Sequence, residues 1–232
     1  YFRKMEEYNQ QGNAPDMTRL PTPPPMDAAA FAQAVDDGMT VLDIRSPEAI
    51  AGAFIPGSLT IPLNMVPAYG GWFLDYDTPI GIVPDSGAYE QVETAVRYLI
   101  RMGYDRIEGF LEGGLHDWET SARHYGRIPA MHIETLRERI SQDGDLILLD
   151  VRKREEFTQG HLEGAQHLFL GYLPEHVDEI PKDRPVVTFC GSGRRAIIAA
   201  SILKRNGFED VSDCLGSMSA CKNTACRIET PA

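Results

Sequence analysis

Short apolar stretches alternate along the chain with longer stretches whose apolar residues recur every three or four positions. The short stretches are typical of buried β-strands, and the longer ones of helices with one apolar face. Strands are expected at residues 39–44, 80–83, 106–110, 146–151, 185–190 and 210–214. Alternating strands and helices are typical of a parallel sheet with helices on both faces. The predicted fold class is therefore α/β.

This pattern occurs twice. Residues 41–45 read VLDIR and residues 148–152 read LLDVR, and each segment follows a helical stretch and a turn. Further on, YLIRMGYDRIEGFLEGGLHDW in the first copy matches ILKRNGFEDVSDCLGSMSAC in the second. A chain of 232 residues has room for two domains of about 100 residues each. We expect two tandem domains, at residues 26–128 and 129–232.

Residues 1–25 precede the repeat. The apolar spacing in residues 1–11 predicts a short helix, and the proline-rich residues 13–25 predict an extended linker. Because the first residue is Tyr1 and not methionine, we expect residues 1–25 to be a linker and the tail of an upstream domain in a longer protein.

Charge excludes some partners. The formal net charge is −12, whereas nucleic-acid binding needs clustered basic residues. Residues 26–128 hold 6 basic and 15 acidic side chains, and residues 129–232 hold 13 and 16, so the second copy is far less acidic. No apolar run approaches the roughly 20 residues that cross a bilayer. We expect a cytoplasmic protein with no membrane partner, and homo-oligomers stay open.

Candidate chemistry lies in the segment PVVTFCGSGRR at residues 185–195. Cys190 is expected where a buried strand ends, and a helix is expected to follow the loop. The loop and the start of that helix consist of Gly191, Ser192, Gly193, Arg194 and Arg195. Amides of such a loop, a helix N-terminus and arginines together bind anions and favour a thiolate. Cys190 is therefore the candidate nucleophile, and Arg195 a candidate anion ligand.

Plainer roles compete with these. Cys190 could instead be a buried structural thiol, and Arg194 could be a solvated surface charge. Asp150 and Arg152 are expected to support loops by hydrogen bonds, because the first copy carries the same pair, Asp43 and Arg45. His161 is expected to be a satisfied surface histidine, and the alternative is that it borders the pocket of the site.

Three further cysteines, Cys214, Cys221 and Cys226, are expected to be free thiols. Their spacings of seven and five differ from those of zinc sites, so no metal site is expected. Cys221 matches Trp118 of the first copy, which favours a packing role, and a thiol that resolves an intermediate on Cys190 is the alternative.

The motif C-G-S-G-R-R resembles the active-site loop of rhodanese sulfurtransferases. The segments LLDVR, GHLEGAQHL and GSMSACKNT are similar to other usual segments of that family. The resemblance implies two rhodanese-like domains. It also implies that Cys190 takes sulfane sulfur from thiosulfate or a low-molecular-weight persulfide, holds it as a persulfide within the loop, and passes it to a thiophile. Its partners would be small sulfur-containing anions and thiols, with no cofactor in this chain.

The first copy departs from that motif. Pro84 stands at the cysteine position and Tyr89 at the arginine position, and Asp85 adds negative charge. We therefore expect residues 26–128 to form an inactive rhodanese-like domain.

Residues 1–15, YFRKMEEYNQQGNAP, resemble the closing helix of metallo-β-lactamase-fold proteins fused to rhodanese domains. Some of those fusions are iron-dependent persulfide dioxygenases. The resemblance implies an upstream metallo-β-lactamase-like domain, which would carry any iron or zinc.

Two other functions stay open. Related phosphatases and arsenate reductases share the fold, although their loop is one residue longer and holds a larger oxyanion. The other hypothesis is that the chain is a non-catalytic interaction module.

Overall fold

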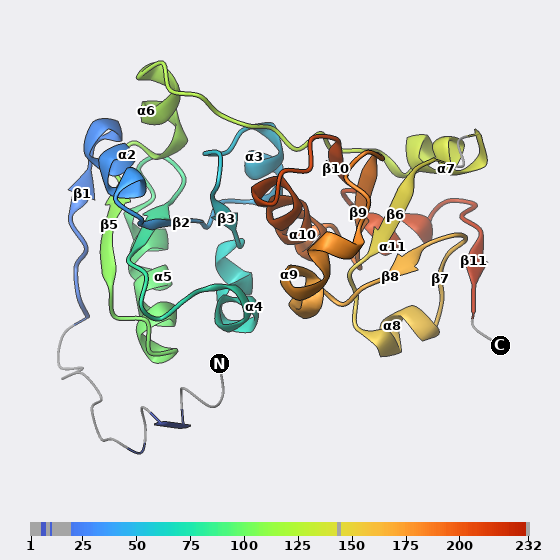
Figure 1. Cartoon of the computed structure of the whole chain (residues 1–232), viewed down its shortest axis with the longest axis horizontal. Coiled ribbons are helices and arrows are strands. Elements are labelled where there is room, and N and C mark those ends of the chain that lie inside the picture. The colour runs from blue at the N-terminus through green and yellow to red at the C-terminus, as the bar shows by residue number, and fades with distance from the viewer. Residues whose placement is uncertain (1–5, 8–9, 11–19, 143–144, 231–232) are drawn as a thin grey trace. The chain divides into compact units, whose positions relative to one another are not determined.

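The structure is a computed structural model that describes residues 6–7, 10, 20–142 and 145–230 (Figure 1). The helix predicted at residues 1–11 and the first part of the linker fall largely outside these residues. Contacts within the chain divide it into two units. The first unit comprises residues up to 46 and residues 58–125, and the second comprises residues 47–57 and those from 126 onward.

The first unit is built on a five-stranded parallel sheet in the order β1-β5-β4-β2-β3. Its strands are β1 (Pro25–Met26), β2 (Thr40–Asp43), β3 (Leu59–Thr60), β4 (Ile80–Val83) and β5 (Ile107–Leu111). Its helices are α2 (Ala28–Asp36), α4 (Val66–Phe73), α5 (Tyr89–Arg101) and α6 (Gly114–Thr120), with a 3₁₀ turn η1 (Leu63–Met65). The three strands predicted for this copy are confirmed. The proline-rich stretch ends in the sheet, since Pro25 pairs with Phe110.

The second unit repeats this plan with a four-stranded parallel sheet in the order β10-β9-β6-β8. Its strands are β6 (Ile147–Asp150), β8 (Gln166–His167), β9 (Val186–Phe189) and β10 (Val211–Asp213), with β7 (His161–Leu162) and β11 (Ile228–Glu229) in an antiparallel pair. Its helices are α3 (Pro47–Gly52), α7 (Ile133–Gln142), α8 (Arg154–Thr158), α9 (Leu173–His176), α10 (Arg194–Arg205) and α11 (Ser217–Cys221), with 3₁₀ turns η2 (Leu170–Tyr172) and η3 (Val177–Glu179). The strands predicted for this copy are also confirmed.

The two sheets correspond strand by strand. β2, β3, β4 and β5 of the first occupy the positions of β6, β8, β9 and β10 in the second. In the first sheet β1 pairs with β5 at the outer edge. At the corresponding edge of the second sheet, Ala130 forms an isolated parallel bridge with Asp213 of β10. The sequence repeat is therefore a structural repeat.

Strand β9 positions the candidate nucleophile because both of its faces are covered. Val187 and Phe189 belong to an apolar cluster with residues of α7 and α11. Side chains alternate along a strand, so Val186 and Thr188 point to the opposite face, where α10 packs on β9. All four residues of β9 are buried. The strand thus delivers Cys190 to the carboxyl edge of the sheet, where ligand sites of such folds lie.

No helix in the part of the chain that the structure describes is long and apolar enough to cross a membrane.

Candidate active site

Cys190 is held by its backbone between β9 and α11. Its N–H donates to Ser217 Oγ at 3.1 Å, and its carbonyl accepts from the N–H of Met218 at 3.1 Å. The residue is 1% exposed. These bonds fix the position of Cys190 independently of the loop that follows.

The sulfur of Cys190 lies against the start of α10. The N–H of Gly193 donates to Cys190 Sγ at 3.1 Å. Gly193 is the N-cap of α10 and has a φ of +94°, and a Cβ there would lie 3.3 Å from Cα of Leu215. Glycine is therefore required for the turn that aims this amide at the sulfur. The amide and the helix N-terminus both favour negative charge on the sulfur.

Arg195, predicted as an anion ligand, forms a two-point ion pair with Glu156 of α8. Nη1 and Nη2 donate to the two carboxylate oxygens at 2.6 and 2.8 Å. The hydrogen bond from Arg195 is the main reason that the pKa of Glu156 is lowered. A Cβ on Gly191 would lie 2.9 Å from Arg195 Nη2, so the guanidinium lies beside the loop. Arg194 and Ser192 are exposed.

Asp150 and Arg152 form a buried pair beside the site. Arg152 Nε and Nη2 donate to the Asp150 carboxylate at 2.7 to 2.9 Å, and Nη2 also donates to the carbonyl of Gly160 at 2.8 Å. Asp43 and Arg45 form the same pair in the first unit, with bonds of 2.9 and 2.6 Å. The Asp–Arg pair therefore occurs in both repeats, including the one that lacks the cysteine. This recurrence favours a supporting role over a catalytic one.

Ser217 adopts an unusual backbone conformation. Its φ is +41°, a region that side chains other than glycine rarely enter. It is fully buried, and its Oγ also donates to the carbonyl of Cys214 at 2.6 Å. The matching residue of the first repeat is Gly114, whose φ is +59°. A strained serine thus replaces an unstrained glycine beside the candidate nucleophile.

Cys214 is a second free thiol close to the site. It is fully buried, and burial is the main cause that raises its pKa to about 12, followed by the charge of Asp213. Cys214 therefore stays protonated at neutral pH and is a poor nucleophile. Ser217 Oγ accepts from the N–H of Cys190 and donates to the carbonyl of Cys214, so the backbones of the two cysteines lie near each other.

Asp213, at the end of β10, is a buried carboxyl group, and neither of its oxygens has a hydrogen-bond partner among the described residues. Burial first, and then the charge of Glu48 on α3, raises its pKa to about 8. By sheet register the first repeat has the buried Phe110 at this position, so the second repeat places a carboxyl group where the first has an apolar ring.

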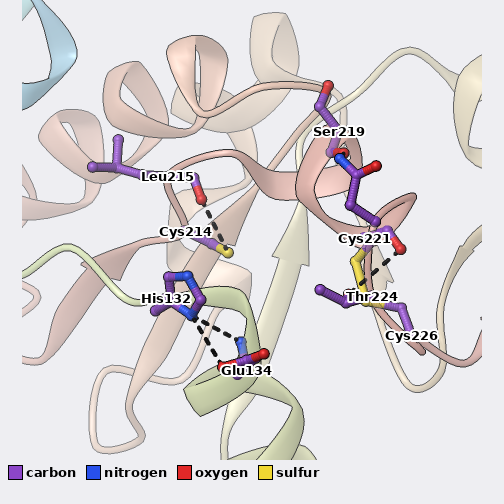
Figure 2. The surroundings of a disulfide bond; sticks show 9 residues. His132, Glu134, Cys214, Leu215, Ser219, Cys221, Thr224 and Cys226 are labelled. Carbon is purple, nitrogen blue, oxygen red and sulfur yellow. Dashed lines mark hydrogen bonds and ion pairs between the residues drawn. A yellow bond between two sulfur atoms is a disulfide. The ribbon is translucent and has the colours of Figure 1, made fainter.

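Two of the sequence predictions are wrong. Cys221 and Cys226 form a disulfide instead of two free thiols (Figure 2). The turn after α11 brings their Cα atoms to 5.4 Å, within the usual range for a disulfide. His161 is not a surface residue, since it is only 9% exposed. Its ring stacks on that of Phe157, with the ring centroids 3.8 Å apart. Its Nδ1 lies 3.1 Å from the carbonyl of Phe157, so it is satisfied as expected.

The first repeat lacks the chemical groups of this site. Pro84 has neither a thiol nor an N–H, and Tyr89 is 56% exposed and packs its ring edge-on against Phe110. Asp85 accepts a hydrogen bond from the side-chain amide of Gln91 at 2.9 Å. The equivalent loop, residues 84–89, therefore presents no cysteine and no arginine.

In the part of the chain that the structure describes, no three His, Cys, Asp or Glu side chains are grouped as ligands.

Comparison with known proteins agrees with the repeat. The family model for the rhodanese-like domain matches residues 27–121 and 132–224, so the chain belongs to the rhodanese family with two tandem domains.

Among its relatives, a putative sulfur carrier protein, YrkF of Bacillus subtilis, is 31% identical over 107 residues, which are 46% of this chain and 56% of that protein. A sulfurtransferase of Allochromatium vinosum is 36% identical over 87 residues, which are 38% of this chain and 81% of that one. The solved thiosulfate sulfurtransferase of Pseudomonas aeruginosa has a TM-score of 0.42 and 18% identity, covering 90% of this chain and 44% of its own. The chain thus spans little more than half of the first relative. The family model and the match to the Allochromatium vinosum sulfurtransferase indicate a role for the chain within the sulfurtransferase family.

Proposed function

We propose that the second domain is a sulfurtransferase in which Cys190 carries the transferred sulfur as a persulfide. The observation that carries the proposal is the hydrogen bond from the Gly193 amide to Cys190 Sγ at the start of α10. This bond lies inside the loop whose sequence resembles rhodanese active sites, and the sulfurtransferase relatives agree with it.

The reaction has two half-reactions. The Cys190 thiolate attacks the outer sulfur of a sulfane donor, forming an S–S bond and releasing the rest of the donor with the electron pair of the broken bond. With thiosulfate the products are sulfite and a Cys190 persulfide anion. A thiophile such as a thiol or cyanide then attacks the outer sulfur of the persulfide and restores the thiolate. The pattern is covalent catalysis with ping-pong kinetics.

The residues around the sulfur have separate roles in this proposal. The Gly193 amide and the start of α10 stabilise the anionic sulfur in each state. Gly191, Ser192, Arg194 and Arg195 border the place where the second sulfur is held. Asp150 and Arg152 support the neighbouring loops. Because Cys190 is 1% exposed, the site favours donors whose transferable sulfur is terminal and slender.

The remaining proposals concern the rest of the protein. The first domain is non-catalytic, since Pro84 and Tyr89 replace the nucleophile and the arginine. The resemblance of residues 1–15 supports an upstream metallo-β-lactamase-like domain that would exchange persulfide sulfur with Cys190. The protein would act in the cytoplasm on small sulfur anions and thiols.

Steady-state kinetics test the function. Purified protein is assayed for thiocyanate formation from cyanide with varied thiosulfate or thiosulfonate. Parallel double-reciprocal lines and loss of turnover in Cys190→Ser are expected. Turnover that survives Cys190→Ser would contradict the proposal, as would aryl phosphate hydrolysis that depends on Cys190.

A further inference from the structure

We propose that Glu156 sets the charge of the sulfur donor that Cys190 accepts, favouring donors with one negative charge over donors with two. This inference rests on the proposed function, and it concerns the substrate class of the same site.

The ion pair between Glu156 and Arg195 is firmly held. Both carboxylate oxygens accept from the guanidinium, at 2.6 and 2.8 Å, and Oε2 also accepts from the N–H of Lys153 at 3.3 Å. The side chains are 38% and 16% exposed, so solvent screens the pair only in part. The pKa of Glu156 is lowered, mainly by its hydrogen bond from Arg195, so the carboxylate stays charged at neutral pH.

The pair lies beside the nucleophile loop. A Cβ built on Gly191, the residue after Cys190, would meet Arg195 Nη2 at 2.9 Å. The guanidinium therefore borders the loop, and both of its terminal nitrogens are bonded to the carboxylate of Glu156. Because the paired charges have opposite signs, they largely cancel for an anion near the loop, which leaves the Gly193 amide and the start of α10 to attract it.

The first repeat shows that the fold does not require this acid. The repeat offset places Ala49 at the position of Glu156 and Tyr89 at the position of Arg195. Both members of the pair are absent in the repeat that lacks the cysteine, and both are present in the repeat that has it. The acid is therefore associated with the candidate nucleophile and not with the architecture.

Charge affects the choice of donor through simple electrostatics. A carboxylate near the loop repels a dianion about twice as strongly as a monoanion at the same position. Thiosulfate is a dianion, whereas methanethiosulfonate has a methyl group in place of one charged oxygen and is a monoanion. Both donate a terminal sulfur to the Cys190 thiolate, and their leaving groups are sulfite and methanesulfinate. The two donors therefore differ mainly in charge.

The test compares kcat/KM for the two donors, with cyanide as acceptor, in the wild type, in Glu156→Gln and in Glu155→Gln. Glu155 is the matched control because it is an exposed acid in the same helical turn. Glu156→Gln should raise the ratio of thiosulfate to methanethiosulfonate by about tenfold, and Glu155→Gln should leave it near the wild-type value. Partial unfolding cancels in this ratio, because both donors report on the same folded fraction.

An unchanged or lowered ratio in Glu156→Gln overturns the inference, and so does an equal rise in Glu155→Gln. A failure of the proposed function has a different result, since neither donor would then transfer sulfur through Cys190 in the wild type. If the wild type turns over methanethiosulfonate and the ratio does not respond to Glu156, only the donor inference fails.

Discussion

The hydroxyl group of Ser217 accepts a hydrogen bond from the backbone N–H of Cys190 at 3.1 Å. The same hydroxyl donates to the carbonyl of Cys214, so it links the ends of β9 and β10 just below the candidate nucleophile. The link is held in a left-handed backbone conformation that costs about 1–3 kcal/mol for a residue other than glycine. The cost of this conformation indicates that the hydroxyl positions Cys190.

Two variants separate the hydroxyl from the strain. Ser217→Gly and Ser217→Ala both remove the hydroxyl, but only glycine relieves the backbone. We expect both to slow persulfide formation by about tenfold, because a displaced nucleophile reacts poorly. Ser217→Gly should be more stable than Ser217→Ala by about 1 kcal/mol in urea unfolding. A wild-type rate in Ser217→Gly would show that the hydroxyl is dispensable.

Asp213 should make stability depend on pH. Its pKa is about 8 in the folded protein, above the ordinary value of 3.8, so the folded state binds its proton more tightly than the unfolded state does. The protonated carboxyl of Asp213 therefore contributes its full share to the free energy of unfolding at low pH, and this share is lost as the pH rises from about 4 to 8.

Asp213→Asn removes this charge with little change in shape. At pH 8 the free energy of unfolding of the variant, measured with urea, should exceed that of the wild type by roughly 1–3 kcal/mol. This difference should shrink at pH 5. Equal stability of the two proteins at both pH values would show that the carboxyl is not buried in its charged form.

The disulfide between Cys221 and Cys226 closes a short loop, so its contribution to stability should be modest. A loop of this length corresponds to about 2 kcal/mol in the chain-entropy description. Cys226→Ser should lower the unfolding free energy by up to that amount while leaving the sulfur-transfer rate unchanged. Adding a reductant to the wild type is the matched control. A large loss of rate in Cys226→Ser with the fold intact would instead assign the cysteine pair a role in resolving the persulfide.

The strands and the nucleophile loop were predictable because they depend on local patterns. β9 is a continuous buried run, and the two glycines after Cys190 precede a long apolar helix. Comparing the two copies also predicts a supporting role for Asp150 and Arg152 and the missing cysteine of the first repeat, although it does not predict that the two side chains bind each other. These features are encoded within a few residues of one another.

Other parts of the site depend on distant contacts. Glu156 meets Arg195 across 39 positions of sequence, and only the joint replacement of both in the first repeat signals the pair. Sequence reasoning does not single out Ser217, because only the backbone shows that this serine adopts a positive φ where the first repeat has a glycine. Cys226 approaches Cys221 because the chain turns back after α11, which cysteine spacing alone does not reveal. Likewise, the burial of His161 comes from stacking on Phe157 and from its place on β7.

The most direct measurement is the mass of the protein after brief treatment with methanethiosulfonate, followed by peptide mapping with the persulfide trapped by an alkylating reagent. The wild type should gain the mass of one sulfur atom on Cys190, with Cys214 unmodified because its pKa is raised to about 12. Cyanide should remove that sulfur and yield thiocyanate. A donor that is consumed while Cys190 stays unmodified, or a sulfur found on Cys214, would contradict the account.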